Sequence, residues 1–151
     1  MSWRCCSASI RKENVVSSAG PRSLVVEDDE FIRMHACDIL SEAGFHCDEA
    51  ADSDSARVLL DAAGGSITLL FTDVEMPGEM DGFELARYVA EHWPETAIVV
   101  ASGRVNPAPG QMPDGATFIG KPFSAQLVYD HLQQMLPDGR KPEPLRRRSV
   151  T

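Results

Sequence analysis

Acidic, hydroxyl and lysine side chains follow four separate apolar runs of this 151-residue chain. They are Glu27, Asp28, Asp73, Ser102 and Lys121. Carboxylates that come together repel one another unless a cation lies among them. Carboxylate oxygens without histidine or cysteine suit Mg²⁺ better than zinc. A metal ion, an ammonium group and a hydroxyl donor are together what a phosphoryl group needs, because phosphoryl transfer depends on positioning and charge neutralisation.

Asp73 ends the most apolar stretch of the chain, the run 66–73 with the sequence SITLLFTD. A buried strand end is an unfavourable place for a negative charge unless another group pairs with it. A carboxylate in such a place can itself attack a phosphoryl group and form an aspartyl-phosphate. The residue types therefore favour Asp73 as a phosphoacceptor, with the other carboxylates, the serine and the lysine around it.

Strands and helices alternate along the chain and would bring these side chains to one place. Strands are expected at 22–29, 45–50, 66–73, 96–102 and 115–123, and helices at 29–45, 52–65, 81–93 and 124–136. Apolar strands that alternate with helices predict an α/β fold, a doubly wound five-stranded parallel sheet with both faces covered. Ligands bind such sheets at the carboxyl ends of the strands, where the reactive side chains are expected.

The charge of the chain narrows the classes of partner. The formal net charge is −9, and because both ends are net positive, the negative charge is concentrated between them. An acidic body argues against nucleic acid as the main ligand and favours a cation site or a basic partner surface. The four cysteines show no metal-binding spacing. With neither a signal peptide nor an apolar run near the ~20 residues of a membrane span, we expect a cytoplasmic protein.

The composition divides the chain into three parts. We expect 1–20 to be a flexible leader, 21–136 to form one domain, and 137–151 to be a basic, Pro- and Arg-rich disordered tail. The tail leaves no room for a helix-turn-helix, so no DNA-binding domain is expected. Output would then depend on contact with another protein.

Four motifs follow one another in a known order: LVVEDDEFIR, LLFTDVEMPGEMDGFEL, VVASGR and TFIGKPF. Over 22–136 they resemble the successive motifs of the receiver domain of response regulators. The resemblance implies a flavodoxin-like, CheY-like fold, Mg²⁺ as cofactor, and a stand-alone regulator. Such a protein takes a phosphoryl group from a sensor histidine kinase or a histidine phosphotransfer protein and signals to a downstream protein. It is a phosphoacceptor rather than an enzyme, although it assists its own phosphorylation and slow dephosphorylation.

The resemblance also implies a role for each residue of the metal and acceptor site. Asp73 resembles the phosphoacceptor. Asp28 resembles a direct Mg²⁺ ligand, and Glu27 resembles its acidic neighbour, which reaches the ion through water. Glu75 resembles the residue whose backbone carbonyl binds the ion, with Asp73 itself as a further ligand.

A second group of residues resembles the part of the family's site that binds and senses the phosphoryl group. Ser102 resembles the hydroxyl residue that follows the phosphoryl group on activation, and Lys121 resembles the family's lysine. Phe118 occupies the position of the aromatic residue that moves inward with the hydroxyl. The peptide bond from Lys121 to Pro122 is expected to be cis, an uncommon isomer that marks a specific turn.

The chain departs from the family pattern in two loops. The sequence MPGEMDG at 76–82 is one residue longer than the common form, so we expect a bulged loop after Asp73. The segment 103–117 is short and rich in proline, so we expect the fourth helix to be short or absent. That helix belongs to the family's usual output face.

Several functions stay open. The alternative to a phosphorylated regulator is a phosphorylation-independent, receiver-like module that binds proteins. An aspartyl-phosphate hydrolase of the haloacid type is disfavoured, because Glu75 stands where that class needs a second aspartate. The sequence leaves the kinase and downstream target open, and with them the choice among phosphorelay intermediate, phosphate sink and partner-switching regulator.

Overall fold

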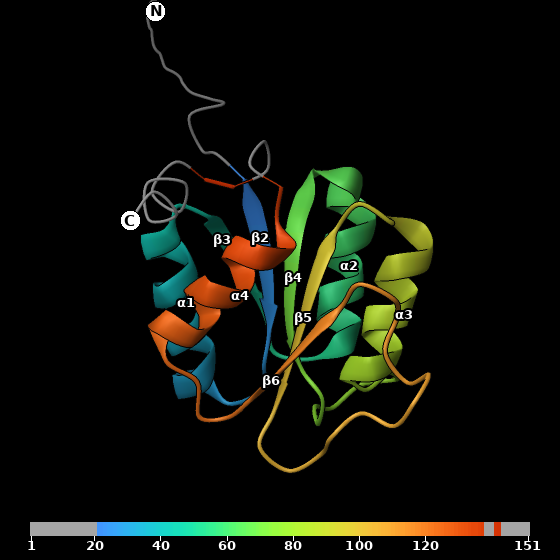
Figure 1. The fold of residues 1–151 in the computed structure, drawn as a ribbon. Helices are drawn as coiled ribbons and strands as arrows, with labels where there is room; N and C mark the ends of the chain where they lie inside the picture. The colour runs from blue at the N-terminus through green and yellow to red at the C-terminus, as the bar shows by residue number, and fades with distance from the viewer. Residues whose placement is uncertain (1–20, 138–140, 143–151) are drawn as a thin grey trace, which may run out of the picture.

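The computed structural model describes residues 21–137 and 141–142 (Figure 1). In chain order the elements are β2 (Arg22–Val26), α1 (Glu30–Ala43), β3 (His46–Ala50), α2 (Ser53–Ala63), η2 (Gly64–Ser66), β4 (Ile67–Asp73), α3 (Gly82–His92), β5 (Ala97–Ser102), β6 (Thr117–Gly120) and α4 (Ala125–Met135). The leader predicted at 1–20 and most of the tail predicted at 137–151 lie outside the described residues.

The five strands form one sheet in the order β3-β2-β4-β5-β6, and every neighbouring pair is parallel. The predicted doubly wound, five-stranded parallel sheet is thereby confirmed. The chain runs outward from β2 to β3 and then crosses back to β4 on the other side of β2. This reversal puts the carboxyl ends of β2 and β4 side by side at the position where such sheets bind ligands.

Helices cover both faces of the sheet (Figure 1). Successive strand residues point to opposite faces, so Val25 packs with α1 and α4, whereas its neighbour Leu24 packs with α2 and α3. The strands are therefore apolar on both sides, which is why they lack an alternating pattern. Among the described residues, no helix is long and apolar enough to cross a membrane.

Side chains at the helix ends explain where the helices begin. Asp29 caps α1 by accepting from the N–H groups of Phe31 and Ile32, and Ser124 caps α4 in the same way. At the start of α3, Asp81 and Glu84 form a reciprocal capping box. These caps fix the first turns of the helices that follow β2, β4 and β6.

The expectation of a short or absent fourth helix needs correction. The fourth helix in chain order is present, as the 11-residue α4 after β6. The segment between β5 and β6, for which the expectation was made, is described throughout and contains turns but no helix over 103–116. Its prolines lack the N–H groups that a helix needs. Val105 and Met112 from this segment pack on the sheet face instead.

Candidate functional site

Three carboxylates meet at the carboxyl edge of the sheet. Glu27 and Asp28 directly follow β2, and Asp73 is the last residue of β4. One carboxylate oxygen from each lies within 4.8 Å of the other two. Glu27 and Asp73 are 5% and 6% exposed, whereas Asp28 is exposed to solvent. The cluster is thus a group of negative charges that is buried at Glu27 and Asp73 and open to solvent at Asp28.

Lys121 connects the two buried carboxylates of this cluster. Its Nζ donates to Glu27 Oε1 at 2.7 Å and to Asp73 Oδ1 at 2.7 Å. Burial alone would lower the pKa of Lys121, but the hydrogen bonds to Asp73 and Glu27 outweigh burial and raise the pKa. The lysine is therefore charged at neutral pH, and one positive charge faces three acidic groups.

Glu27 is held at every polar atom. Oε1 accepts from Lys121, and Oε2 accepts from the backbone N–H of Asp29 at 3.1 Å. Arg33 donates from Nη1 to the Glu27 carbonyl at 2.9 Å and from Nε to Glu49 at 3.1 Å. Burial raises the pKa of Glu27, and the bonds from Lys121 and Asp29 oppose that rise. Sequence reasoning assigned Arg33 no role in the site, because its two partners, the residue after β2 and a residue of β3, are known only once the strands are placed.

The start of α3 lies directly against the acceptor strand. Gly82 donates its N–H to the carbonyl of Val74 at 2.8 Å. A Cβ atom at position 82 would lie 1.9 Å from the carbonyl oxygen of Asp73. Only glycine allows the two backbones to approach so closely.

The longer loop that follows Asp73 is anchored on the first turn of α2. The N–H of Met80 donates to Ser53 Oγ at 3.1 Å, and the N–H of Ser53 donates to the Pro77 carbonyl at 3.3 Å. Gly78 has a φ of +117°, and a Cβ there would lie 2.2 Å from Ser53 Oγ. The loop therefore extends from the acceptor towards α2.

The remaining predicted site residues, Ser102, Phe118 and Glu75, make no hydrogen bond to the carboxylates of the cluster. Ser102, at the end of β5, is buried and accepts at Oγ from the N–H groups of Arg104 and Val105. Phe118 on β6 is half-buried against the α2 and α3 face. Glu75 is half-exposed, and its side chain faces Arg104 at 3.9 Å.

The turn after β6 brings Lys121 to the cluster. The peptide bond between Lys121 and Pro122 is cis. The N–H of Lys121 donates to the Ser102 carbonyl at 3.0 Å, which ties the end of β6 to the end of β5. The same turn leads into Phe123, which packs in the core under α1.

Residues 23–133 match the family of the response regulator receiver domain. The response regulator receiver protein CpdR of Brucella abortus is 34% identical over 119 residues, which span 76% of this chain and 96% of CpdR. The sensor kinase CckA of the same organism is 32% identical over 116 residues, 75% of this chain, but the match spans only 12% of that kinase.

Solved structures agree with these sequence matches. The chemotaxis protein CheY4 of Vibrio cholerae superposes with a TM-score of 0.67 at 29% identity, over 78% of this chain and 100% of CheY4. The sequence matches and the order of the strands therefore support the same family. The chain belongs to the response regulator receiver domain family, whose members are phosphoacceptor modules of two-component signalling rather than classical enzymes.

Proposed function

We propose that the protein is a response regulator that accepts a phosphoryl group on Asp73 from a sensor histidine kinase or a histidine phosphotransfer protein. The observation that carries the proposal is the lysine bridge, in which Nζ of Lys121 lies 2.7 Å from both Glu27 and Asp73. A buried nucleophile beside a fixed positive charge and a metal-binding set of oxygens fits the needs of phosphoryl transfer.

The donor set at this site fits Mg²⁺. The three clustered side chains, which belong to Glu27, Asp28 and Asp73, offer only carboxylate oxygens. We propose that Asp28 and Asp73 bind the ion directly, that the backbone carbonyl of Glu75 adds a third oxygen, and that Glu27 acts through water. Bound Mg²⁺ would neutralise the charge of the phosphoryl oxygens.

The protein's own residues would share the transfer step. Lys121 holds Oδ1 of Asp73, so Oδ2 is the attacking atom in the proposal. Its lone pair forms the new bond to phosphorus as the bond from phosphorus to the donor's histidine nitrogen breaks. Lys121 then neutralises a phosphoryl oxygen, and the Ser102 hydroxyl donates to another. Phe118 would move inward with Ser102, as a half-buried side chain can.

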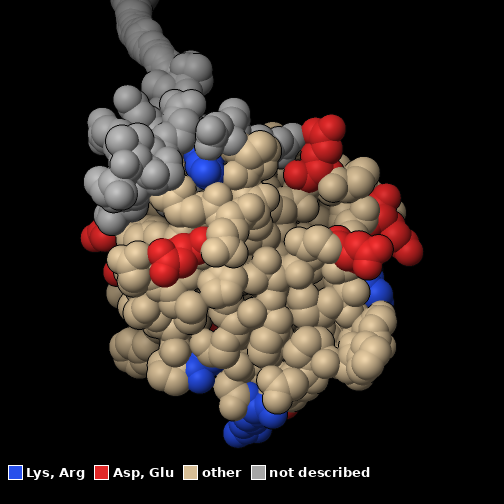
Figure 2. All heavy atoms as spheres, in the orientation of Figure 1, with Lys and Arg blue, Asp and Glu red and all other residues tan. Residues whose placement is uncertain are grey.

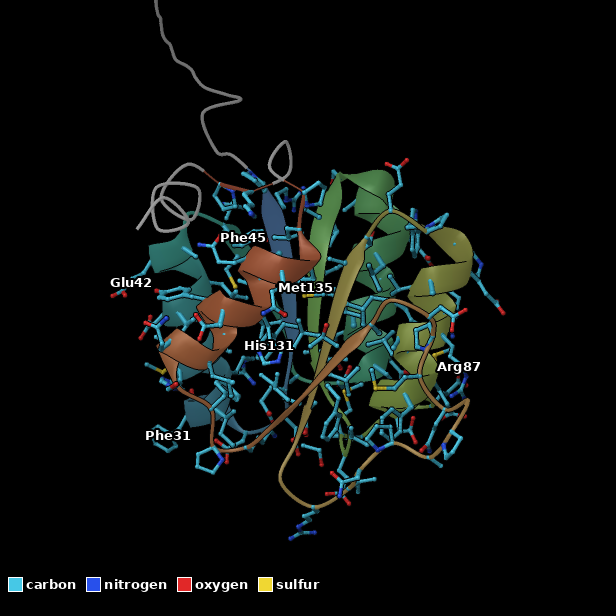
Figure 3. The ribbon with its side chains drawn as sticks, in the orientation of Figure 1. Phe31, Glu42, Phe45, Arg87, His131 and Met135 are labelled. Atoms are coloured by element: carbon cyan, nitrogen blue, oxygen red, sulfur yellow. The ribbon has the colours of Figure 1, made fainter. Side chains whose placement is uncertain are left out.

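An apolar surface beside the site supports docking of a donor protein. Phe31 and Met34, on the first turns of α1, are 80% and 53% exposed, and Figure 3 shows Phe31 pointing away from the ribbon. An apolar hollow next to them is lined by Ile32, Lys121 and Phe123, among others. An exposed patch of this kind is typical of a protein-binding surface.

Output through protein contact is supported by the face that α4 and β6 form. Together these two elements carry a single Asp, Glu, Lys or Arg residue, Asp130. Figure 2 shows the centre of this face as almost uncharged, with charged side chains towards its margins. The free thiols of Cys37 and Cys47 fit a reducing compartment such as the cytoplasm, where we place the protein.

The test is phosphotransfer from purified, radiolabelled histidine kinases to the full chain. Asp73→Asn should abolish labelling, and the matched variant Asp130→Asn, at an exposed position of α4, should keep it. Beryllofluoride with Mg²⁺ should shift the amide NMR signals around Ser102 and Phe118. Undiminished labelling of Asp73→Asn would overturn the proposed acceptor. Absence of any beryllofluoride response in the parent protein would favour the phosphorylation-independent binding module.

A further inference from the structure

Two thiols face each other on the side of the sheet away from β6. Cys37 lies on α1 and Cys47 on the edge strand β3, and their sulfur atoms are 3.0 Å apart and hydrogen-bonded. Cys37 is 9% exposed and packs in the core, whereas Cys47 is partly exposed. Both are free cysteines. Neither takes part in the proposed phosphoryl chemistry.

We propose that Cys37 and Cys47 form a redox modification site, which a hydroperoxide closes into a reversible disulfide between α1 and β3. A disulfide needs a sulfur separation of about 2.05 Å, so the two atoms need to approach by only about 1 Å. The bond joins a helix to a strand that it already contacts, so the two elements do not have to be brought together from a distance. This proposal does not depend on the proposed phosphoacceptor function.

The surroundings of Cys47 suit it to react first. It is the more accessible thiol, and thiolates rather than thiols are the reactive form. Ser23 lies directly opposite Cys47 in the register of β2 and β3. Ser23 is fully buried, and its hydroxyl has no hydrogen-bond partner among the described residues, so a rotation of the hydroxyl can direct it to the sulfur of Cys47 on the same face of the sheet. A buried hydroxyl that donates to a sulfur stabilises that sulfur as an anion.

The pKa values of the two thiols move in opposite directions. The hydrogen bond with Cys37 lowers the pKa of Cys47, and the Ser23 hydroxyl lowers it further, against burial and the nearby carboxylates of Glu49 and Asp48. The same bond raises the pKa of Cys37, and burial adds to the rise. The pair therefore contains one sulfur suited to attack an oxidant and one that stays protonated until it is needed.

The reaction balances with a hydroperoxide as the oxidant. The Cys47 thiolate attacks the OH-bearing oxygen of the hydroperoxide, the O–O bond breaks, and a sulfenic acid forms on Cys47 as hydroxide leaves hydrogen peroxide or an alkoxide leaves an organic hydroperoxide. The Cys37 sulfur then attacks the Cys47 sulfur, the S–O bond breaks, and the proton of Cys37 leaves with the hydroxyl as water. Two thiols lose two electrons in total, and the peroxide is reduced by two electrons.

The disulfide would act on the neighbouring contact between α1 and β3. Arg33 lies four residues before Cys37 on α1, and Glu49 lies two residues after Cys47 on β3, so the two pairs share one interface. Arg33 joins Glu49 to the backbone carbonyl of Glu27. A covalent bond one helical turn away would hold α1 against β3 and so restrict this edge of the sheet.

The experiment uses the full chain with Cys5→Ser and Cys6→Ser, so that only the proposed pair remains. The folded protein is treated with hydrogen peroxide, quenched, alkylated and mapped by peptide mass spectrometry without reduction. We expect a cross-link between Cys37 and Cys47 at a rate independent of protein concentration, reversed by dithiothreitol. The melting temperature should rise by about 5 °C or more, because a disulfide limits the unfolded chain.

Three variants separate this mechanism from random oxidation. In Cys37→Ala, Cys47 should accumulate a sulfenic acid that dimedone traps, whereas in Cys47→Ala the buried Cys37 should resist peroxide. Ser23→Ala keeps both thiols and should slow the peroxide reaction several-fold. The proposal is overturned if both thiols of the unaltered pair stay open to alkylation after peroxide treatment. It is equally overturned if the cross-link forms only in urea, a result that does not depend on the folding of the Cys37, Cys47 or Ser23 variants.

Discussion

Two neighbouring regions differ in how many polar contacts stabilise them: the carboxyl edge of β2 and β4, and the segment 103–116. At the carboxyl edge, charged hydrogen bonds from Lys121 and Arg33 fix Glu27 and Asp73 from several elements. The segment 103–116 has no helix, and a bond from Arg87 of α3 to the Gln111 carbonyl ties it to the fold (Figure 3). The acceptor site, whose atoms need fixed positions, is stabilised by several hydrogen bonds between distant segments. The neighbouring segment 103–116 has fewer such bonds to the rest of the fold. Substitutions in the first region should therefore cost much more stability than substitutions in the second.

The largest effect is expected from Gly82→Ala, which tests how tightly α3 is pressed against Asp73. The new methyl group would meet the Asp73 carbonyl oxygen at 1.9 Å. Backbone has to move on one side or the other, so we expect a loss of about 3 kcal/mol or more in the free energy of unfolding. Urea unfolding followed by circular dichroism measures it.

Gly110→Ala in the segment 103–116 is the matched control for Gly82→Ala. It has a φ of +80° and open space around its Cα. We expect a loss of only about 1 kcal/mol, from backbone strain. Equal losses at the two glycines would contradict the contrast between the regions.

A smaller but still large effect is expected from Lys121→Met. The substitution keeps an apolar stem but leaves the buried carboxylates of Glu27 and Asp73 without their cation. Removing one partner of a buried ion pair costs about 3 kcal/mol; since the lysine side chain is 16% exposed, water reduces this to about 2 kcal/mol. Thermal unfolding with and without Mg²⁺ measures both the loss and its recovery, because the metal should stabilise this variant more than the parent. Equal stabilisation of both proteins by Mg²⁺ would argue against a shared cation site.

Arg87→Ala tests the hydrogen bond that connects the segment 103–116 to α3. The variant loses the guanidinium bond to the Gln111 carbonyl. A single exposed bond of this kind contributes about 0.5–1 kcal/mol, so global stability should change little. Amide hydrogen exchange in 103–116 should accelerate several-fold while exchange in β2 and β4 stays unchanged. Faster exchange in β2 would show that the two regions are coupled.

The smallest effect concerns pH at the start of α2, where the loop after Asp73 is anchored. The backbone N–H of Ser55 lowers the pKa of Asp52, which caps this helix. Because the folded-state pKa is depressed, the stabilisation is present above the unfolded pKa of about 3.9 and is lost as the pH falls through the folded value. Asp52→Asn should therefore flatten the fall in melting temperature below about pH 4. An unchanged acid profile would show that the cap contributes nothing.

The sequence predicted the strand ends well because they depend on local patterns. Apolar runs that end in Glu27, Asp73 and Lys121 identified both the sheet and the cluster, since parallel strands share one carboxyl edge. The segment 103–116 has no helix, as its prolines indicate, but the expectation of a short or absent fourth helix was wrong, because the fourth helix of the chain is present as α4. Continuous apolar runs for the strands and a period of 3.6 for the helices contain this information.

Contacts between distant segments could not be predicted in the same way. Arg33 with the Glu27 carbonyl, Cys37 with Cys47, and the loop after Asp73 with Ser53 all depend on which helix lies on which strand. A single sequence has no local signal for such pairs. They follow only after the order of the sheet is known.

The lysine bridge also has a consequence for synthesis. Its two bonds join residues 94 and 48 positions apart, so they close among the last contacts of the fold. While Lys121 is still inside the ribosome, the nascent chain already contains the three carboxylates but lacks the cation that pairs with them. The carboxylates then repel one another, so this edge of the sheet is unstable until Lys121 emerges. The acceptor site can therefore be completed only after the chain has been made as far as Lys121, when every strand of the sheet is already present.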